Sequence, residues 1–236
     1  MANVHIFGNS YAYGLYGREA DWSSLLKLDA GDRRVRNEQP YVSVINHSGP
    51  GNMLVHSLES EQIQANVNCN RRGRQLAIFC IGSAEACIVT PKGDTEPRRS
   101  LPDFQQDLSR LADVIADLNE GHDESPLTPM YASSTPVDEA VAREIWKGDI
   151  FNNDRFIEYD EVVKTHASDM GADFIDLRTG FDATTMLTFD GVHANQLGNR
   201  FMLEKIGGAA LGCLGFKDLS SISAQMPELA PRDQEI

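Results

Sequence analysis

Two polar segments near opposite ends of the chain carry the residue types of a nucleophilic hydrolysis. Ser10 follows a short apolar run near the start, and Asp190 and His193 lie three residues apart near the end. A serine hydroxyl is a weak nucleophile until a base removes its proton, and histidine can be that base near neutral pH. A carboxylate can fix the imidazole tautomer and stabilise the imidazolium. We therefore predict a catalytic triad of Ser10, His193 and Asp190.

An acyl-transfer reaction at this serine also needs hydrogen-bond donors for the oxyanion of its tetrahedral intermediate. The backbone N–H groups of Ser10, at the opening of a predicted helix, and of Gly51 are the natural candidates. Taken alone, Ser10 would more often be a helix N-cap, and the alternative for Gly51 is a glycine that simply permits a tight turn. Their placement directly after predicted strands, together with His193, favours the catalytic interpretation.

Five short apolar runs predict the strands that must position these residues. Their near-continuous apolar character is typical of strands covered on both faces. The five predicted strands are Val4–Phe7, Tyr41–Ile45, Leu76–Ile81, Leu127–Ala132 and Asp173–Leu177. Ser10, Gly51 and the 82–85 turn each come soon after one of these runs.

Helical patterns lie between the strands, over Leu54–Val67, Asp103–Leu118, Phe156–Met170 and Asn195–Leu211. The alternation predicts right-handed crossovers and a doubly wound parallel sheet. Ligands of such a sheet bind outside the carboxyl ends of its strands, so the polar turns should meet at one edge.

Residues 1–219 read as a single domain, and the polar segment 220–236 as a flexible C-terminal tail. No internal repeat or domain linker is evident in the sequence. Two connections, 91–102 and 135–153, are long for an α/β protein, and we expect them to form lids or walls of the site.

The charge and composition of the chain limit which classes of partner it can have. The net charge is −14 over 236 residues, and this field repels phosphate backbones and anionic membranes. No apolar run is long enough to span a bilayer, and the N-terminus lacks a basic n-region, so we expect a cytoplasmic protein with no membrane or nucleic-acid partner. The four cysteines show no zinc-ligand spacing, and no metal site is predicted.

Three sequence blocks resemble those of the SGNH (GDSL-type) esterase and lipase superfamily. FGNSYAYG at 7–14 is similar to its first block, usually FGDS, VINHSGPG at 44–51 to its second, and DGVHAN at 190–195 to its last. The resemblance implies a three-layer α/β/α flavodoxin-like sandwich with a five-stranded parallel sheet of order 2-1-3-4-5. It also implies ester hydrolysis without a cofactor, with Gly51 as the oxyanion glycine of the second block.

Two positions depart from the family pattern. Asn9 stands where the family usually has aspartate, next to the nucleophile. Ala84 stands where the third block has an asparagine that donates to the oxyanion. Losing one such donor typically costs about 10² to 10³ in rate. Either Ser83 or Asn52 takes over as donor, or the enzyme works slowly with two backbone donors, or the site keeps binding and has lost catalysis.

The predicted substrate is a small acyl ester, with an acetylated carbohydrate as the first choice. We expect Asn9, Tyr11, His47 and Ala84 to contact it. Two alternatives remain open: a catalytically impaired binding or scaffold protein on the same fold, and an acyltransferase that uses an alcohol acceptor in place of water. The sequence leaves the oligomeric state open.

Overall fold

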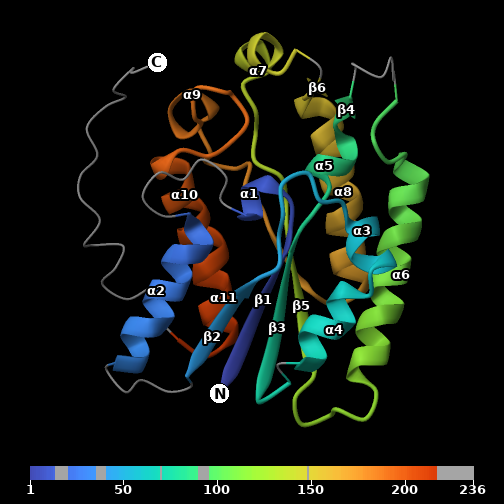
Figure 1. The fold of residues 1–236 in the computed structure, drawn as a ribbon, viewed down its shortest axis with the longest axis vertical. Coiled ribbons are helices and arrows are strands. Elements are labelled where there is room, and N and C mark those ends of the chain that lie inside the picture. The colour runs from blue at the N-terminus through green and yellow to red at the C-terminus, as the bar shows by residue number, and fades with distance from the viewer. Residues whose placement is uncertain (14–20, 36–40, 70, 90–95, 148, 217–236) are drawn as a thin grey trace.

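The computed structural model describes residues 1–13, 21–35, 41–69, 71–89, 96–147 and 149–216. The predicted tail, 220–236, lies outside the described residues. A central sheet is covered by helices on both faces, which gives the three layers that the sequence predicts (Figure 1).

The sheet contains five parallel strands in the order β2-β1-β3-β5-β7. The strands are β1 (Ala2–Gly8), β2 (Val42–Asn46), β3 (Arg74–Cys80), β5 (Leu127–Ala132) and β7 (Asp173–Ile175). Counted along the chain within this sheet, the order is 2-1-3-4-5, so the predicted topology is confirmed. The register pairs Val4 of β1 with Val44 on one side and Leu76 on the other.

Two groups of helices cover the two faces of the sheet (Figure 1). One group contains α2 (Trp22–Val35), α10 (Gln196–Met202), the π-helical turn η2 (Leu203–Gly207) and α11 (Gly208–Cys213). The other contains α3 (Leu54–Glu59), α4 (Gln62–Cys69), α6 (Leu101–Asn119) and α8 (Asn153–Asp169).

Short elements surround the carboxyl ends of the strands. They are α1 (Ser10–Tyr13), α5 (Ser83–Ala86), α7 (Glu139–Ile145), α9 (Ala183–Met186) and the antiparallel pair β4 (Ile88–Val89) and β6 (Asp149–Ile150). The predicted site therefore lies at the carboxyl ends of the strands, where these short elements surround it.

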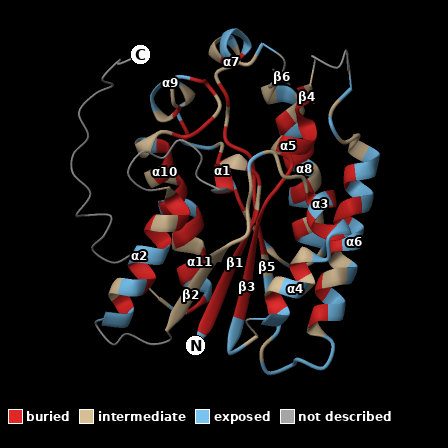
Figure 2. Ribbon diagram, viewed as in Figure 1, coloured by how far each residue is buried: buried red, intermediate tan, exposed pale blue. Residues whose placement is uncertain are grey.

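Each face of the sheet has its own apolar core, as expected from side chains that alternate along a strand. Ile6 and Ile78 pack with Trp22 on the α2 side. Phe7 and Phe79 pack with the α6 and α8 residues on the other side. Figure 2 shows the central strands buried along nearly their full length, which explains why their sequences are apolar on both faces.

Three helices differ from the sequence prediction. The predicted helix 54–67 is two helices, α3 and α4, and the break contains Glu61 with a φ of 50°. The last predicted helix contains the π-helical turn η2 between α10 and α11. Helix α2 was not predicted, because two of its inward positions are charged: Asp29 and Arg33 are both buried and form an ion pair of 2.6 Å with each other.

Candidate active site

Ser10 lies at a sharp turn where the central strand β1 ends and α1 begins. The turn needs a glycine at position 8, because a Cβ there would lie 2.4 Å from the carbonyl oxygen of Cys80. The side chain of Asn9 supports the turn by accepting a hydrogen bond from the backbone N–H of Tyr11 at 3.3 Å. The strand-to-helix turn therefore presents Ser10 at the carboxyl edge of the sheet.

The structure brings the three predicted triad residues into one hydrogen-bonded chain. Ser10 Oγ lies 2.9 Å from Nε2 of His193, although 183 residues separate them. Nδ1 of the same imidazole lies 2.6 Å from Oδ2 of Asp190. Both His193 and Asp190 are buried. In this arrangement the imidazole faces the hydroxyl with one nitrogen and the carboxylate with the other.

The loop that holds Asp190 and His193 is fixed at several points. An isolated bridge joins Leu187 to Ala194, and the N–H of Thr188 donates to the carbonyl of His193 at 2.7 Å. Gly191 has a φ of 72°, and a Cβ there would lie 2.8 Å from the carbonyl oxygen of Asp138. Only glycine fits this turn without displacing the neighbouring segment.

Hydrogen bonds keep Asp190 ionised in this buried place. Burial alone would raise its pKa. The bonds from the ring and backbone of His193, the hydroxyl of Thr188 and the N–H of Val192 outweigh that effect and lower the pKa to about 2. The carboxylate is thus charged throughout the pH range in which a histidine base works.

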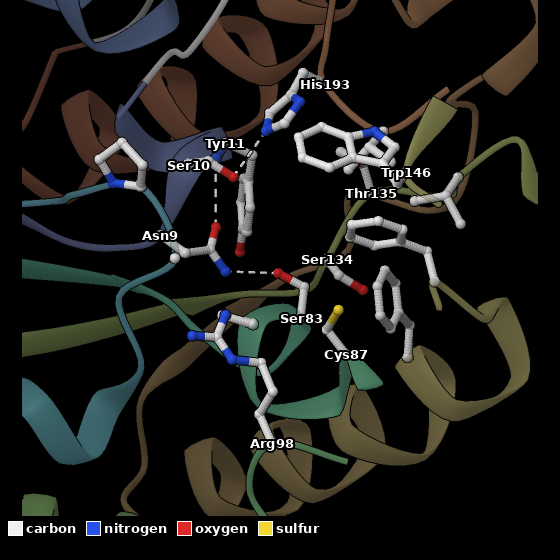
Figure 3. A pocket seen from close by; sticks show the side chains of 17 residues that line it. Asn9, Ser10, Tyr11, Ser83, Cys87, Arg98, Ser134, Thr135, Trp146 and His193 are labelled. Carbon is white, nitrogen blue, oxygen red and sulfur yellow. Dashed lines mark hydrogen bonds between the residues drawn. The ribbon is translucent and has the colours of Figure 1, made fainter. Parts of the chain in front are cut away.

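A cavity of about 190 Å³ opens beside Ser10 and His193 (Figure 3). One wall is apolar and largely aromatic, and the other is polar. The apolar wall contains Val137, Trp146, Phe151, Phe156 and Val192. The polar side contains Asn9, Gly51, Ser83, Arg98, Ser134 and Thr135.

Most of the predicted site residues lie in this pocket. Besides Ser10 and His193, the lining includes Gly51 and Ser83, the predicted oxyanion donors. It also includes three predicted substrate contacts, Asn9, Tyr11 and Ala84. Asp190 lies behind the imidazole of His193 and does not line the cavity.

Two further predicted residues, His47 and Asn52, do not line the pocket. The imidazole of His47 stacks on Phe7 with ring centroids 4.9 Å apart and hydrogen-bonds Nδ1 of His5 at 3.1 Å. Burial, with the nearby His5, lowers the pKa of His47 to about 4, so the ring packs as a neutral group. Asn52 folds back over Gly49, where a Cβ would lie 2.9 Å from its Nδ2. We therefore withdraw His47 as a substrate contact and Asn52 as an oxyanion donor.

The third block is held by a buried carboxylate next to Ala84. Oε1 of Glu85 accepts from the N–H of Leu54 at 2.6 Å, and its Oε2 accepts from the N–H of Gly82 at 2.9 Å. Burial raises the pKa of Glu85. This side chain ties the start of α5 to the start of α3 and fixes the wall that carries Ser83.

Several pocket residues were not predicted from the sequence, among them Trp146 and Arg98. The indole of Trp146 lies 5.8 Å from the ring of His193, centroid to centroid. Arg98 lies near Gly51, where a Cβ would be 3.6 Å from its Nη1. Both residues belong to the long connections 91–102 and 135–153, whose length predicts walls of a site but not which side chains point inward.

Among the described residues, no group of three or more histidine, cysteine, aspartate or glutamate side chains is arranged to hold a metal ion. In the same part of the chain, no helix has the length and apolar character that crossing a membrane requires.

Comparisons with known proteins bear on the family and the fold of the chain. The family model described as GDSL-like lipase/acylhydrolase matches residues 4–206. A lipase/acylhydrolase from Enterococcus faecalis has a similar structure, with a TM-score of 0.60 and 19% identity over 98% of this chain and 100% of that one. A comparison with curated proteins gives no match.

Two further solved structures are similar. An acetyl xylan esterase has a TM-score of 0.61 and 20% identity, over 88% of this chain and 98% of that one. An aryl esterase of M. smegmatis has a TM-score of 0.58 and 16% identity, over 89% of this chain and 96% of that one. At these identities the likeness concerns the fold.

Proposed function

This chain belongs to the GDSL-like lipase/acylhydrolase family, and from that premise we propose that it is a serine esterase with Ser10 as nucleophile, His193 as base and Asp190 as the orienting carboxylate. The observation that carries the proposal is the continuous chain of hydrogen bonds from Ser10 Oγ through His193 to Asp190, at 2.9 and 2.6 Å, beside a cavity. Nucleophile, base and orienting group have the mutual geometry of a triad.

The reaction proceeds in two steps. Ser10 Oγ attacks the acyl carbon while Nε2 of His193 takes its proton, and the N–H groups of Ser10 and Gly51 donate to the oxyanion. The intermediate collapses, His193 protonates the leaving alcohol, and an acyl-serine remains. Water, activated by His193, then attacks the acyl-serine and releases the acid.

The pocket favours a small ester. Its volume of about 190 Å³ suits a short acyl group, and the aromatic wall with Trp146 and Phe151 offers apolar contact. An acetylated carbohydrate remains our first choice, which agrees with the structural likeness to an acetyl xylan esterase.

Intact-mass labelling with a fluorophosphonate tests the proposal directly. We expect one adduct on the wild-type protein, located at Ser10 and lost in Ser10→Ala, together with hydrolysis of a short-chain aryl ester. A folded wild-type sample that takes up no adduct and releases no alcohol would overturn the proposal.

One observation favours a second candidate function, a binding protein without catalysis: Ala84 lines the pocket at the position of the family's donor asparagine. The two candidates separate on Ala84→Asn. For an esterase with only the two backbone donors, we expect this change to raise kcat at least about 10-fold, because an oxyanion donor is worth roughly 10² to 10³ in rate. An esterase in which another side chain already supplies the third donor is active as the wild type and gains little from the change. Steady-state hydrolysis of an aryl acetate measures it.

Ala84→Leu is the matched control for this prediction, because leucine adds a side chain of similar shape without a donor. A gain with asparagine and none with leucine supports the esterase. Absence of activity in the wild type and in Ala84→Asn, both folded, supports the binding protein.

A further inference from the structure

The two departures from the family pattern meet in one contact. Asn9, at the position of the usual aspartate, donates from Nδ2 to Oγ of Ser83 at 2.6 Å (Figure 3). Ser83 directly precedes Ala84, at the position of the missing donor. Asn9 is buried, and both Asn9 and Ser83 line the pocket with Ser10 and Gly51.

The direction of this hydrogen bond follows from the other end of the Asn9 amide. Its Oδ1 accepts from the backbone N–H of Tyr11, so the amide is turned with Nδ2 toward Ser83. A hydroxyl has one proton to donate and two lone pairs to accept with. Because Ser83 accepts from Asn9, its own proton remains free. Within the described residues, Ser83 Oγ makes no other hydrogen bond.

We propose that the hydroxyl of Ser83 is the third oxyanion donor of this enzyme and that Asn9 is the positioning residue that leaves its proton available. An aspartate at position 9 would accept that proton and turn the hydroxyl away from the substrate. Asparagine at 9 and alanine at 84 are thus one compensated change: the donor has moved from residue 84 to residue 83. This inference rests on the proposed esterase function.

The surroundings of Ser83 suit this task. It is the first residue of α5, whose preceding turn is fixed by the bond from Gly82 to the buried Glu85. A donor that is held in place before the reaction costs no reorganisation when the oxyanion forms. The amide of Asn9 supplies the second constraint, on the hydroxyl itself.

Asn9→Asp is the sharpest test, because aspartate has almost the same shape and keeps an acceptor for the Tyr11 N–H. The donor to Ser83 is lost and a carboxylate charge is gained, and the double variant described below shows how much of the loss the charge causes by itself. We expect kcat for an aryl acetate to fall at least about 10-fold with KM nearly unchanged, and Ser83→Ala to lower kcat by about 10² to 10³. Ser83→Thr, which keeps the hydroxyl, should retain more activity than Ser83→Ala.

The double variant Asn9→Asp/Ser83→Ala separates positioning from a general effect on the fold. If Asn9 acts through Ser83, the two losses are strongly non-additive, and the double variant resembles Ser83→Ala alone. Additive losses, or a Ser83→Ala variant as active as wild type, would overturn the inference. Fluorophosphonate labelling of wild-type Ser10 distinguishes failure of this inference from failure of the proposed function. If wild-type Ser10 is labelled and Ser83→Ala is fully active, only this inference is wrong. If wild-type Ser10 is not labelled, the proposed function itself is wrong.

A separate observation concerns the charge of the pocket. Arg98 lines it, and no described carboxylate pairs with this guanidinium, whereas the neighbouring Arg99 forms a bidentate pair with Asp107 at 2.7 and 2.9 Å. The backbone at Arg98 is fixed, since its N–H donates to the carbonyl of Cys87 at 2.8 Å and that of Arg99 to the carbonyl of Glu85 at 3.1 Å. Trp146 and Arg98 lie at different ends of the pocket (Figure 3).

From this second observation we infer that Arg98 recognises an anionic group on the substrate, near the ester carbonyl that Gly51 contacts. A guanidinium binds a carboxylate or phosphate with two parallel hydrogen bonds. The protein has a net charge of −14, so most of its surface repels an anionic substrate. A guanidinium in the pocket with no carboxylate partner among the described residues attracts such a group locally.

Two aryl esters test this inference: 4-nitrophenyl acetate and 4-nitrophenyl hemisuccinate, whose acyl group carries an additional carboxymethyl group. For Arg98→Gln we expect the ratio of kcat/KM for hemisuccinate over acetate to fall at least about 10-fold, chiefly through KM. A ratio unchanged from wild type would overturn the inference, whether both rates fall together or neither changes. An equal fall would place Arg98 at the reacting carbonyl instead.

Discussion

Ser10→Ala is expected to lower kcat/KM for a short-chain aryl ester by about 10⁴-fold or more, the largest effect of any single change in this protein. The variant keeps the imidazole, the carboxylate and the pocket, but no atom remains to form the acyl-enzyme. The triad acts as a unit, so removal of its nucleophile removes most of the benefit of the other two members. Stopped-flow and steady-state kinetic assays with 4-nitrophenyl acetate measure this loss of activity.

Ser48→Ala provides the matched control for this variant. Ser48 follows the neighbouring strand β2, lies outside the pocket, and its buried hydroxyl has no hydrogen-bond partner among the described residues. We expect it to stay within about twofold of wild type. If Ser10→Ala retained wild-type activity while its thermal unfolding stayed unchanged, Ser10 would not be the nucleophile.

The sheet could be predicted from the sequence because its strands are buried on both faces, and such strands consist of short runs of apolar residues. The run Leu127–Ala132 matches β5 residue for residue. The run Asp173–Leu177 extends beyond β7, which ends at Ile175. Leu177 is still buried, so burial continues beyond the last ladder bond and the apolar pattern cannot mark that end.

The helix that the sequence concealed shows a limit of apolar periodicity. The inward positions of α2 follow helical spacing from Trp22 through Leu26, but the next turns place Asp29 and Arg33 inward. These charges satisfy each other at 2.6 Å, a solution that is visible only once the helix exists. An analysis of hydrophobic periodicity treats every charged residue as exposed, so it assigns such a buried pair to the polar surface of the helix.

The site was predictable where backbone topology alone brings residues together. Ser10 and Gly51 each follow a parallel strand, and carboxyl ends of parallel strands share one edge. Whether a side chain then faces the pocket does not follow from the topology. His47 also follows β2, but its ring lies against Phe7 in the packing between sheet and helices. Trp146 and Arg98 come from connections whose path no local pattern specifies.

Asp190→Asn is expected to lower kcat by about 10⁴-fold while preserving the shape of the loop. The asparagine Oδ1 can still accept from the N–H groups of Val192 and His193, as Oδ1 of the aspartate does at 2.9 and 3.0 Å. Its Nδ2, however, replaces the Oδ2 that lies 2.6 Å from Nδ1 of His193. The amide donates there, so Nδ1 must be unprotonated and Nε2 must carry the hydrogen. An imidazole in that tautomer cannot take a proton from Ser10.

The same variant also changes how stability depends on pH, which separates a tautomer effect from misfolding. The folded-state pKa of Asp190, about 2, is below the ordinary value of 3.8, so its interactions stabilise the fold above about pH 4 and this contribution is lost as the pH falls toward 2. Asparagine does not titrate and removes this dependence. We expect Asp190→Asn to be folded and inactive at pH 7. Between pH 5 and pH 2 its thermal unfolding temperature should change less with pH than that of the wild type. A folded variant with wild-type kcat would show that this carboxylate does not orient the base.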